Sequence, residues 1–412
     1  MNKAYMRGIA ATFGMLAFCA TAQAETIVVW HSLGKPEEPT RQNFEKWNKT
    51  HPDMPLELRF IPFGQLAQQF IKGIATGDVP DLITIDNPVV ANFANQDALE
   101  DLTERVAASP YIKKQEYYPG SWNTTVWHGR QFAVPGEANT LALYYDPDIF
   151  KAKGLDPDKP PQTWAELKDD AAKLTDKSAN VFGIGFSALQ SEEGTFQWLP
   201  FLQQSGASLK NLKSPDATAA LQLFSDLVNS GSASRDVLVK RQSEMMDVFL
   251  SGGCAMVIGG PWELQRMKKD ARVSWRVAKL PVRQEGGIEA SALGGYVWGI
   301  PKGAKNADQA FQLIEFMSQP EQQKLAWSGG RLPPVSTISV DNPDNAEAYT
   351  VFREQMKVAY PRGPHPEWPK ISAAIQTAIQ TALTGRATPE QALATASGVV
   401  TPLLEQNPID GM

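Results

Sequence analysis

Residues 134–150 read VPGEANTLALYYDPDIF and combine two turns with a short apolar run. The segment opens with a Pro-Gly turn, continues through the apolar residues 141–145, which have the composition of a buried strand, and closes with an Asp-Pro turn. Glu137 and Asn139 form a polar patch between the first turn and the strand. We interpret this segment as a crossing from one lobe to another that lays its polar patch on the floor of a cleft.

The chain before this crossing alternates strands with helices. Apolar strands are expected over residues 25–30, 56–61 and 81–86, with helices beginning near Thr40 and covering residues 65–75. Alternating strands and helices with short joints predict an open α/β sheet, and ligands bind such sheets beyond the carboxyl ends of the strands. This rule points to the residues that follow the first and third strands, namely His31, Ser32, Asp86 and Asn87.

Two later segments share the turn-rich character of residues 134–150. Residues 294–301 read GGYVWGIP and residues 330–334 read GRLPP. A chain of 412 residues that is 42% apolar and 20% charged is long enough for two domains and has a globular composition. We therefore predict two α/β lobes, each a β-sheet flanked by helices, with three crossing segments that form a hinge. The predicted N-terminal lobe comprises residues 25–136 and 296–333, and the predicted C-terminal lobe comprises residues 137–295 and 334–412.

The first 24 residues have the pattern of a cleaved secretory signal. A basic start and an apolar middle precede the small-x-small site Ala22-Gln23-Ala24, so the mature chain is expected to begin near Glu25 in the periplasm. The mature chain carries 37 Lys and Arg against 45 Asp and Glu, a net charge of −8, which disfavours nucleic acid and anionic membranes as partners. Its one remaining cysteine, Cys254, has no second cysteine to pair with in the chain.

No motif for catalysis or cofactor binding is complete. Gly183-Ile184-Gly185 lacks the third glycine of a dinucleotide fingerprint, and residues 185–189 fail the nucleophile-elbow pattern at their last position. The chain has no His-Glu-x-x-His motif and no phosphate-cradling loop, and its four histidines are scattered. The sequence therefore predicts no catalytic residue, no metal ligand and no cofactor, and a protein that is not an enzyme.

An ordered series of short motifs resembles the extracellular solute-binding proteins of ABC importers, in the carbohydrate-binding branch that includes the maltose- and trehalose-binding proteins. The motifs are VVWH at 28–31, GIATGDVPD at 73–81, LYYDPDIF at 143–150, PQTWAEL at 161–167, GGCAMVI at 252–258 and GGYVWGIP at 294–301. Each motif is weak alone, but the ordered set is specific and extends from about residue 27 to about residue 393. The resemblance implies a two-lobe periplasmic binding protein fold that closes on a solute, a membrane permease as partner, and a monomer.

A carbohydrate site combines aromatic platforms with groups that hydrogen-bond hydroxyls. Trp262 follows a strand and a Gly-Gly-Pro turn, which favours a platform role. Tyr296 and Trp298 alternate along one strand and are expected to share a face. Phe196 and Trp198 open one helix, so one ring is expected in the core and the other in the cleft, and we assign Trp198 to the cleft.

The remaining candidates are polar groups and glycines. Arg362 lies in the proline-braced loop 360–368 and needs a partner, and His365 lies in the same loop. Asp86, Asn87, Glu137 and Asn139 are also ordinary turn or cap residues, and glycines 294 and 295 also permit a bend, so each candidate has a structural alternative. The complete predicted ligand-binding set is His31, Ser32, Gln65, Asp86, Asn87, Glu137, Asn139, Trp198, Trp262, Gly294, Gly295, Tyr296, Trp298, Arg362 and His365.

We predict a periplasmic substrate-binding protein that delivers a mono- to disaccharide-sized carbohydrate to an ABC permease. One alternative is an anionic ligand such as an acidic glycoside or a glycerophosphodiester, which would be favoured if Arg362, His31 and His365 converged. A second alternative is a secreted carbohydrate-active enzyme, which would be detected as turnover. A chemoreceptor is a further partner that no feature of the sequence excludes.

Overall fold

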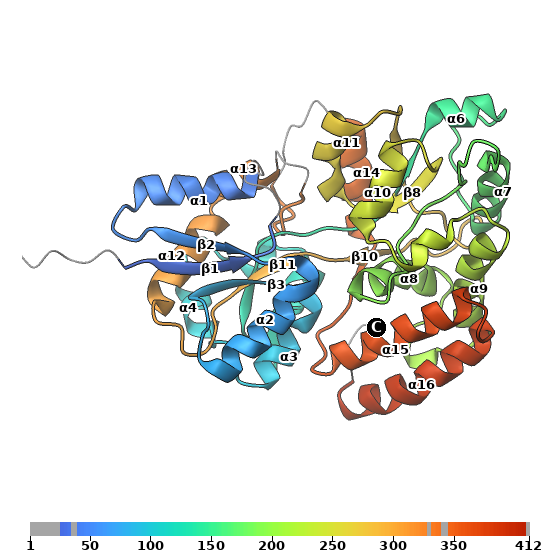
Figure 1. Cartoon of the computed structure of the whole chain (residues 1–412). Helices are drawn as coiled ribbons and strands as arrows, with labels where there is room; N and C mark the ends of the chain where they lie inside the picture. Colours follow the sequence, from blue (N-terminus) through green and yellow to red (C-terminus); the bar gives the residue numbers. More distant parts are fainter. Residues whose placement is uncertain (1–24, 34–38, 328–330, 339–344, 409–412) are drawn as a thin grey trace, which may run out of the picture.

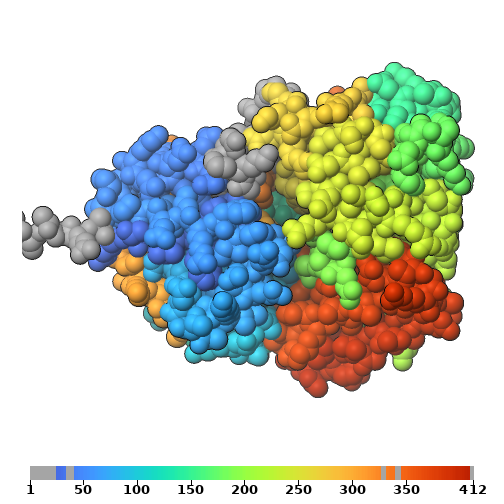
Figure 2. All heavy atoms as spheres, viewed as in Figure 1, coloured from blue at the N-terminus to red at the C-terminus, as the bar shows by residue number. Residues whose placement is uncertain are grey.

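The computed structural model describes residues 25–33, 39–327, 331–338 and 345–408. The predicted signal sequence and Gly330 of the third predicted crossing lie outside these residues. The chain forms two α/β lobes joined by extended segments (Figure 1). Seen as spheres, the lobes meet along a seam, with α2 and α3 of one lobe on one side and the C-terminal helices of the other lobe opposite (Figure 2).

A five-stranded sheet forms the centre of the N-terminal lobe, in the order β2-β1-β3-β11-β6. β1 runs parallel to β2 and β3, whereas β11 runs antiparallel to β3 and β6. The antiparallel β11 lies within the second crossing segment, residues 294–301, so the sheet joins segments far apart in sequence. The strands are β1 (Ile27–His31), β2 (Leu56–Phe60), β3 (Leu82–Asp86), β6 (Ala133–Pro135) and β11 (Tyr296–Gly299).

Alternating side chains of this sheet pack into two separate cores. Val29 and Trp298 join Phe44 of α1 on one face, and Trp30 and Val297 join the α2 side chains on the other. The covering helices are α1 (Pro39–Thr50), α12 (Ala307–Ser318) and α13 (Pro320–Trp327) on the first face and α2 (Phe63–Thr76) and α3 (Val90–Asn95) on the second (Figure 1). Smaller elements are η1 (Asn87–Val89), α4 (Thr103–Ala108), η2 (Lys114–Glu116), α5 (Pro119–Asn123), β4 (Val126–Trp127) and β5 (Arg130–Gln131).

The C-terminal lobe is built on the antiparallel sheet β8-β7-β9. Its strands are β7 (Ala142–Tyr145), β8 (Met256–Gly259) and β9 (Arg276–Ala278). Residues 182–186 form an extended segment with isolated parallel bridges from Phe182 to Cys254 and from Gly185 to Val257 rather than a continuous strand. The helices are α6 (Pro147–Ala152), α7 (Trp164–Leu174), α8 (Glu192–Gln204), η3 (Leu209–Asn211), α9 (Pro215–Asn229), η4 (Arg235–Leu238), α10 (Gln242–Leu250), η5 (Pro261–Glu263), α11 (Leu264–Asp270), α14 (Ala346–Lys357), α15 (Trp368–Leu383) and α16 (Pro389–Gln406).

Local signals for several helix ends are confirmed. Thr163 and Thr388 each form a capping box, with Glu166 and Gln391 respectively. α15 buries Ile371, Ile375, Ile379 and Leu383, and Gly385 follows its end with a left-handed φ of 73°. Asn306 is the N-cap residue of α12, but its side chain makes no capping hydrogen bond and donates to Thr26 O and to Asp81 instead.

The crossing segments lie side by side between the lobes (Figure 1). Asn139 N donates to Gly294 O at 3.0 Å and Gly294 N to Asn139 O at 2.9 Å, so the first two crossings pair directly; Ala138 N donates to Leu332 O of the third at 2.9 Å. β10 (Ser291–Leu293) pairs in parallel with β12 (Ala359–Pro361), which brings a further segment to the hinge. The lobe boundaries stay a prediction.

Candidate functional site

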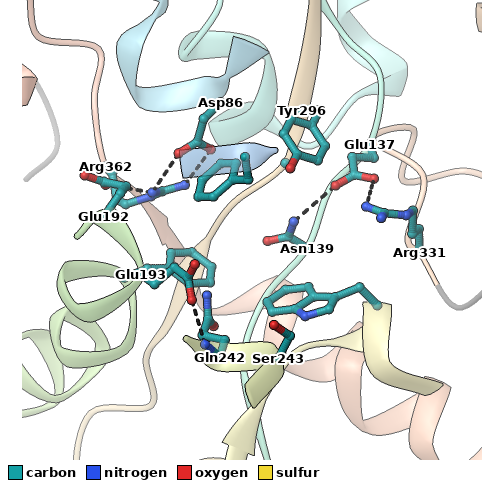
Figure 3. A pocket seen from close by; sticks show the side chains of 14 residues that line it. Asp86, Glu137, Asn139, Glu192, Glu193, Gln242, Ser243, Tyr296, Arg331 and Arg362 are labelled. Carbon is teal, nitrogen blue, oxygen red and sulfur yellow. Dashed lines mark hydrogen bonds and ion pairs between the residues drawn. The ribbon is translucent and has the colours of Figure 1, made fainter. Parts of the chain in front are cut away.

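A cavity of about 190 Å³ lies between the lobes, at the crossing segments (Figure 3). Both lobes contribute to it. Its lining residues are Phe63, Asp86, Glu137, Asn139, Glu192, Glu193, Phe196, Gln242, Ser243, Trp262, Gly295, Tyr296, Arg331 and Arg362.

The N-terminal lobe contributes residues from the ends of its elements. Asp86 is the last residue of β3, Phe63 is the first residue of α2, and Tyr296 is the first residue of β11. The Phe63 and Tyr296 rings meet edge to face, with their centroids 6.0 Å apart. The edge of the sheet at the carboxyl end of β3 therefore carries an acid, Asp86, and the Phe63 and Tyr296 rings. Ligands bind open α/β sheets at this edge.

The C-terminal lobe contributes the first turn of α8. Ser191 caps this helix by accepting a hydrogen bond from Glu193 N, so Glu192 and Glu193 open the helix. Gly194 continues the helix, and the position requires glycine because a Cβ there would overlap the carbonyl oxygen of Leu189. Two residues further on, Phe196 lines the cavity.

The other contributions of this lobe come from α10 and the end of β8. Gln242 and Ser243 are the first two residues of α10, and Trp262 lies in η5 directly after β8 and a Gly-Gly-Pro turn. The Trp262 and Phe196 rings stand 6.5 Å apart at an angle of 40°. These two rings form an aromatic wall on the C-terminal lobe side of the cavity.

Arg362 joins the two lobes at one end of the cavity (Figure 3). Its guanidinium donates to both carboxylate oxygens of Asp86, at 3.2 and 3.0 Å, and to Glu192 Oε1 at 2.7 Å. It also donates to Asn87 Oδ1 at 3.2 Å and lies over the Phe196 ring, with its carbon 4.6 Å from the centroid. Burial opposes the charge of Arg362, but the two carboxylates outweigh it and raise its pKa. We call Arg362, Asp86 and Glu192 the interlobe triad.

A second arginine–carboxylate pair lies on the crossing segments. Arg331 Nη1 donates to Glu137 Oε2 at 2.7 Å, and Asn139 Nδ2 donates to Glu137 Oε1 at 3.3 Å. The polar patch of residues 134–150 therefore lies on the cavity floor and is held by the third crossing (Figure 3).

The cavity is electrostatically acidic. Its lining holds four carboxylates and two arginines, and each arginine is paired with a carboxylate. Burial raises the pKa of Glu192, although Arg362 opposes this change, and burial likewise raises the pKa of Glu193, although the hydrogen bond from Gln242 N opposes it. The acidic groups can accept hydrogen bonds from hydroxyls, and a ligand anion would meet an excess of negative charge.

The structure brings about half of the predicted ligand-binding set to the cavity lining. These residues are Asp86, Glu137, Asn139, Trp262, Gly295, Tyr296 and Arg362. Asn87 and Gly294 border the cavity: Asn87 accepts from Arg362, and Gly294 lies so close to Asn139 and Phe196 that a Cβ there would overlap the Asn139 side chain.

Three aromatic predictions are corrected by burial in the lobe cores. His31 is fully buried beside Phe44 and Phe60, and burial together with the charge of Arg41 lowers its pKa to about 4, so it is neutral. Trp198 is fully buried in the C-terminal lobe, and Phe196 lines the cavity. One ring therefore lies in the core and the other at the cavity, as predicted, but the assignment of Trp198 to the cleft is wrong. Trp298 packs beneath Gly136, and Tyr296 is the residue of that strand that lines the cavity.

Three polar predictions also lie away from the cavity lining. The Ser32 hydroxyl donates to Ile61 O at 2.6 Å within the N-terminal lobe, and Gln65 is exposed on α2. His365 is buried against α16, where its Nε2 lies 3.2 Å from Leu403 O, and burial lowers its pKa. Arg362, His31 and His365 therefore do not converge.

Sequence reasoning missed Phe63, Glu192, Glu193, Gln242 and Ser243 as lining residues. For the two glutamates a signal is present, since Ser191 two residues before Glu193 is a helix N-cap pattern, but the run Ser-Glu-Glu-Gly at 191–194 also has the composition of a polar loop. Gln242 and Ser243 carry no local signal, because tertiary packing within the C-terminal lobe brings α10 beside α8, where Gln242 N donates to Glu193 Oε2 at 2.6 Å.

Comparisons with known proteins agree with this geometry. A family model described as bacterial extracellular solute-binding protein matches residues 32–324. The sn-glycerol-3-phosphate-binding periplasmic protein of Salmonella typhimurium is 24% identical over 417 residues, covering 92% of this chain and 93% of that protein. A putative binding protein of Brucella abortus is 23% identical, covering 97% and 98%.

Solved structures show the same two-lobe architecture. An ABC transporter solute-binding protein of Thermotoga lettingae bound with α-D-tagatose has a TM-score of 0.83 and 26% identity, covering 92% of this chain and all of that one. The maltose-bound MalE3 protein of T. maritima has the same TM-score, identity and coverage. Within the described part of the chain, no helix is long and apolar enough to cross a membrane.

Proposed function

The chain belongs to the bacterial extracellular solute-binding protein family, and from this premise we propose that it binds a neutral carbohydrate or alditol of mono- to disaccharide size in the cavity between its lobes. The loaded protein delivers this solute from the periplasm to the membrane permease of an ABC transporter. It acts as a monomer and without catalysis, and a chemoreceptor is a further partner that this function allows.

The observation that carries the proposal is the combination of rings and hydroxyl-binding groups around one cavity. Trp262 and Phe196 offer aromatic faces from one lobe, and Tyr296 offers a ring from the other. Sugar C–H faces pack on such rings, while sugar hydroxyls need polar partners once they lose water. Asn139, Gln242, Ser243 and the carboxylates supply those partners, and the tagatose- and maltose-bound neighbours support this ligand class.

The charge balance of the cavity argues for a neutral ligand over an anionic one. The glycerol-3-phosphate-binding relative favours the anionic alternative. However, Arg362 and Arg331 are both engaged by carboxylates, and neither His31 nor His365 reaches the cavity. A phosphate would have to displace an internal carboxylate from a buried arginine, which leaves that carboxylate unpaired.

A thermal-shift screen over free sugars, alditols and glycerol 3-phosphate tests the proposal. A bound ligand raises the melting temperature by mass action, so we expect a rise with at least one neutral sugar or alditol and none with glycerol 3-phosphate. Trp262→Ala should weaken binding of that sugar at least roughly tenfold, because an aromatic platform contributes on the order of 1 kcal/mol or more. Trp275→Ala, in the same lobe but outside the cavity lining, should leave the affinity unchanged.

Two results would contradict the proposal. A rise with glycerol 3-phosphate and with no neutral compound would replace it by the anionic alternative. Product released from a glycoside at a useful rate would instead indicate a secreted carbohydrate-active enzyme.

A further inference from the structure

A second, larger cavity adjoins the first. It has a volume of about 500 Å³ and lies between α2, β3 and α3 of the N-terminal lobe and α8 and α15 of the C-terminal lobe. Four residues, Phe63, Asp86, Glu192 and Glu193, line both cavities and form the partition between them. Phe63 and Glu193 come from opposite lobes, so the passage beside them depends on the position of the lobes.

The walls of the second cavity expose mainly apolar surface, although Gln68, Thr84, Asn92, Arg241 and Gln376 also line it. On the N-terminal lobe side the Phe70 and Phe93 rings meet edge to face at 4.9 Å, and the half-exposed Ile71 lies beside them on α2. Hydrocarbon surface also comes from the C-terminal lobe. The main apolar side chains on the two sides of the cavity are Phe70, Ile71, Phe93, Leu189, Pro369 and Ala373.

Contacts between the lobes already enclose this space. Asn92 Nδ2 of α3 donates to Pro366 O, just before α15, at 2.6 Å. The interlobe triad closes the side next to the first cavity. Arg241, at the start of α10, reaches the beginning of α2, where its Nη2 lies 3.9 Å from the position of a Cβ on Gly64. The second cavity is therefore a chamber bounded by both lobes, with the exposed residues Ala67, Ile71 and Ala373 at its solvent side.

We propose that the second cavity takes the apolar substituent of a ligand whose sugar part occupies the first cavity, that is, an alkyl or aryl glycoside. This inference rests on the proposed function. A sugar hydroxyl placed against Phe70, Ile71 and Phe93 would lose its water without gaining partners, whereas an alkyl or aryl group gains by burial there. The shared partition allows one molecule to place its polar part against Asn139 and Gln242 and its apolar part between α2 and α15.

Calorimetry with matched glycosides tests the inference on the full chain. The probes are the methyl and octyl glycosides of glucose, galactose and maltose in both anomers, all below their micelle-forming concentration. For any sugar that binds as the methyl glycoside, we expect the octyl glycoside to bind at least roughly tenfold tighter, because several methylenes become buried. Octyl tetraethylene glycol, which carries the same chain without a sugar, should bind more weakly than the octyl glycoside.

Two substitutions separate the second cavity from the first. Ala373 on α15 and Ala67 on α2 are both exposed and both line the second cavity only, so a larger side chain at either position fills the chamber without entering a lobe core. Ala373→Trp or Ala67→Trp should abolish the octyl advantage and leave the methyl glycoside affinity unchanged. Thr377→Trp, one turn further along α15 and outside the lining, is the matched control and should keep the advantage.

The outcomes distinguish the two proposals. If a methyl glycoside binds and its octyl partner binds no tighter, the second cavity does not take an apolar substituent, and the carbohydrate function stands. Equal binding by octyl tetraethylene glycol and the octyl glycoside would show an apolar site that is independent of the sugar, and would also overturn the inference. If no free sugar, alditol or methyl glycoside binds, the proposed function itself fails.

Discussion

Removal of the Arg362 guanidinium should destabilise the protein strongly. Its side chain is 4% exposed, and its partners Asp86 and Glu192 are only 15% and 20% exposed. Arg362→Met keeps an apolar stem over Phe196 but leaves both carboxylates without their cation. Breaking a buried ion pair in this way typically costs about 3–5 kcal/mol. Because both carboxylates retain some contact with water, we expect the lower end, about 3 kcal/mol at pH 8.

The destabilisation caused by Arg362→Met should be smaller at acid pH. Burial already raises the pKa of Glu192, and loss of Arg362 removes an opposing effect, so protonation of Glu192 relieves the unpaired charge as the pH drops toward 5. For the same reason, Glu192→Gln in the Arg362→Met background should recover at least half of the lost stability.

Urea unfolding followed by far-UV circular dichroism at pH 8 and pH 5 measures these effects. Lys168→Met is the control, because the Lys168–Asp226 pair is short, at 2.6 Å, but its side chains are 45% and 34% exposed, and such pairs contribute about 0–1 kcal/mol. A loss in Arg362→Met no larger than that in Lys168→Met, or a loss that grows toward pH 5, would refute the reasoning.

Three further substitutions test other parts of the structure by thermal or urea unfolding. Burial raises the pKa of Glu263 to about 7, so the wild-type protein should lose stability as the pH rises from about 5 to about 8 and this carboxyl group ionises. Glu263→Gln should remove about 2–3 kcal/mol of that loss in the free energy of unfolding, and parallel pH profiles for the two proteins would contradict this. Gly194→Ala should destabilise by about 1–3 kcal/mol despite the better helix propensity of alanine, because the new Cβ overlaps the Leu189 carbonyl; a stabilised variant would show that the backbone yields. Thr163→Ala should cost about 1 kcal/mol through loss of the α7 capping box, and an unchanged midpoint would argue that the cap is dispensable.

The elements that could be predicted are those with a local physical signal. The spacing of isoleucines in α15, the capping threonines of α7 and α16, and the apolar run of β7 each appear within a few residues of sequence. The crossings were also predictable, because Pro-Gly and Gly-Gly turns interrupt the apolar pattern where the chain changes lobe. The order of such motifs along the chain indicates a two-lobe solute-binding fold, whereas no single motif does.

The site was less predictable because side-chain direction at the end of an element depends on tertiary packing. His31 is the last residue of β1, at the correct edge of the sheet, yet its side chain is fully buried beside Phe44 of the lobe core and the half-exposed Phe60. The sequence predicts that one of Phe196 and Trp198 is buried in the core and that the other faces the cavity. Which ring faces the cavity depends on where α8 begins, and Gly194 obscures that start because glycine is also common in loops. Gln242 and Ser243 reach the cavity only because α10 packs beside α8 within the C-terminal lobe, a tertiary contact that has no local signal in the sequence.

The arrangement of contacts also bears on how a solute would close the proposed binding site. The contacts between the lobes and crossing segments include the interlobe triad, the paired backbone of Asn139 and Gly294, and the hydrogen bond from Asn92 to Pro366 O. Tyr296 and Trp262 come from different lobes and line the same cavity. A ligand shifts a conformational equilibrium only by the difference in its affinity for the two states. A solute that touches one lobe alone would therefore bind without closing the protein, whereas one that bridges both lobes would favour the closed form. Affinity and closure should thus be separable. Substitutions at Trp262, which lies on one lobe, should reduce closure more than substitutions at Glu137 and Asn139 on the cavity floor.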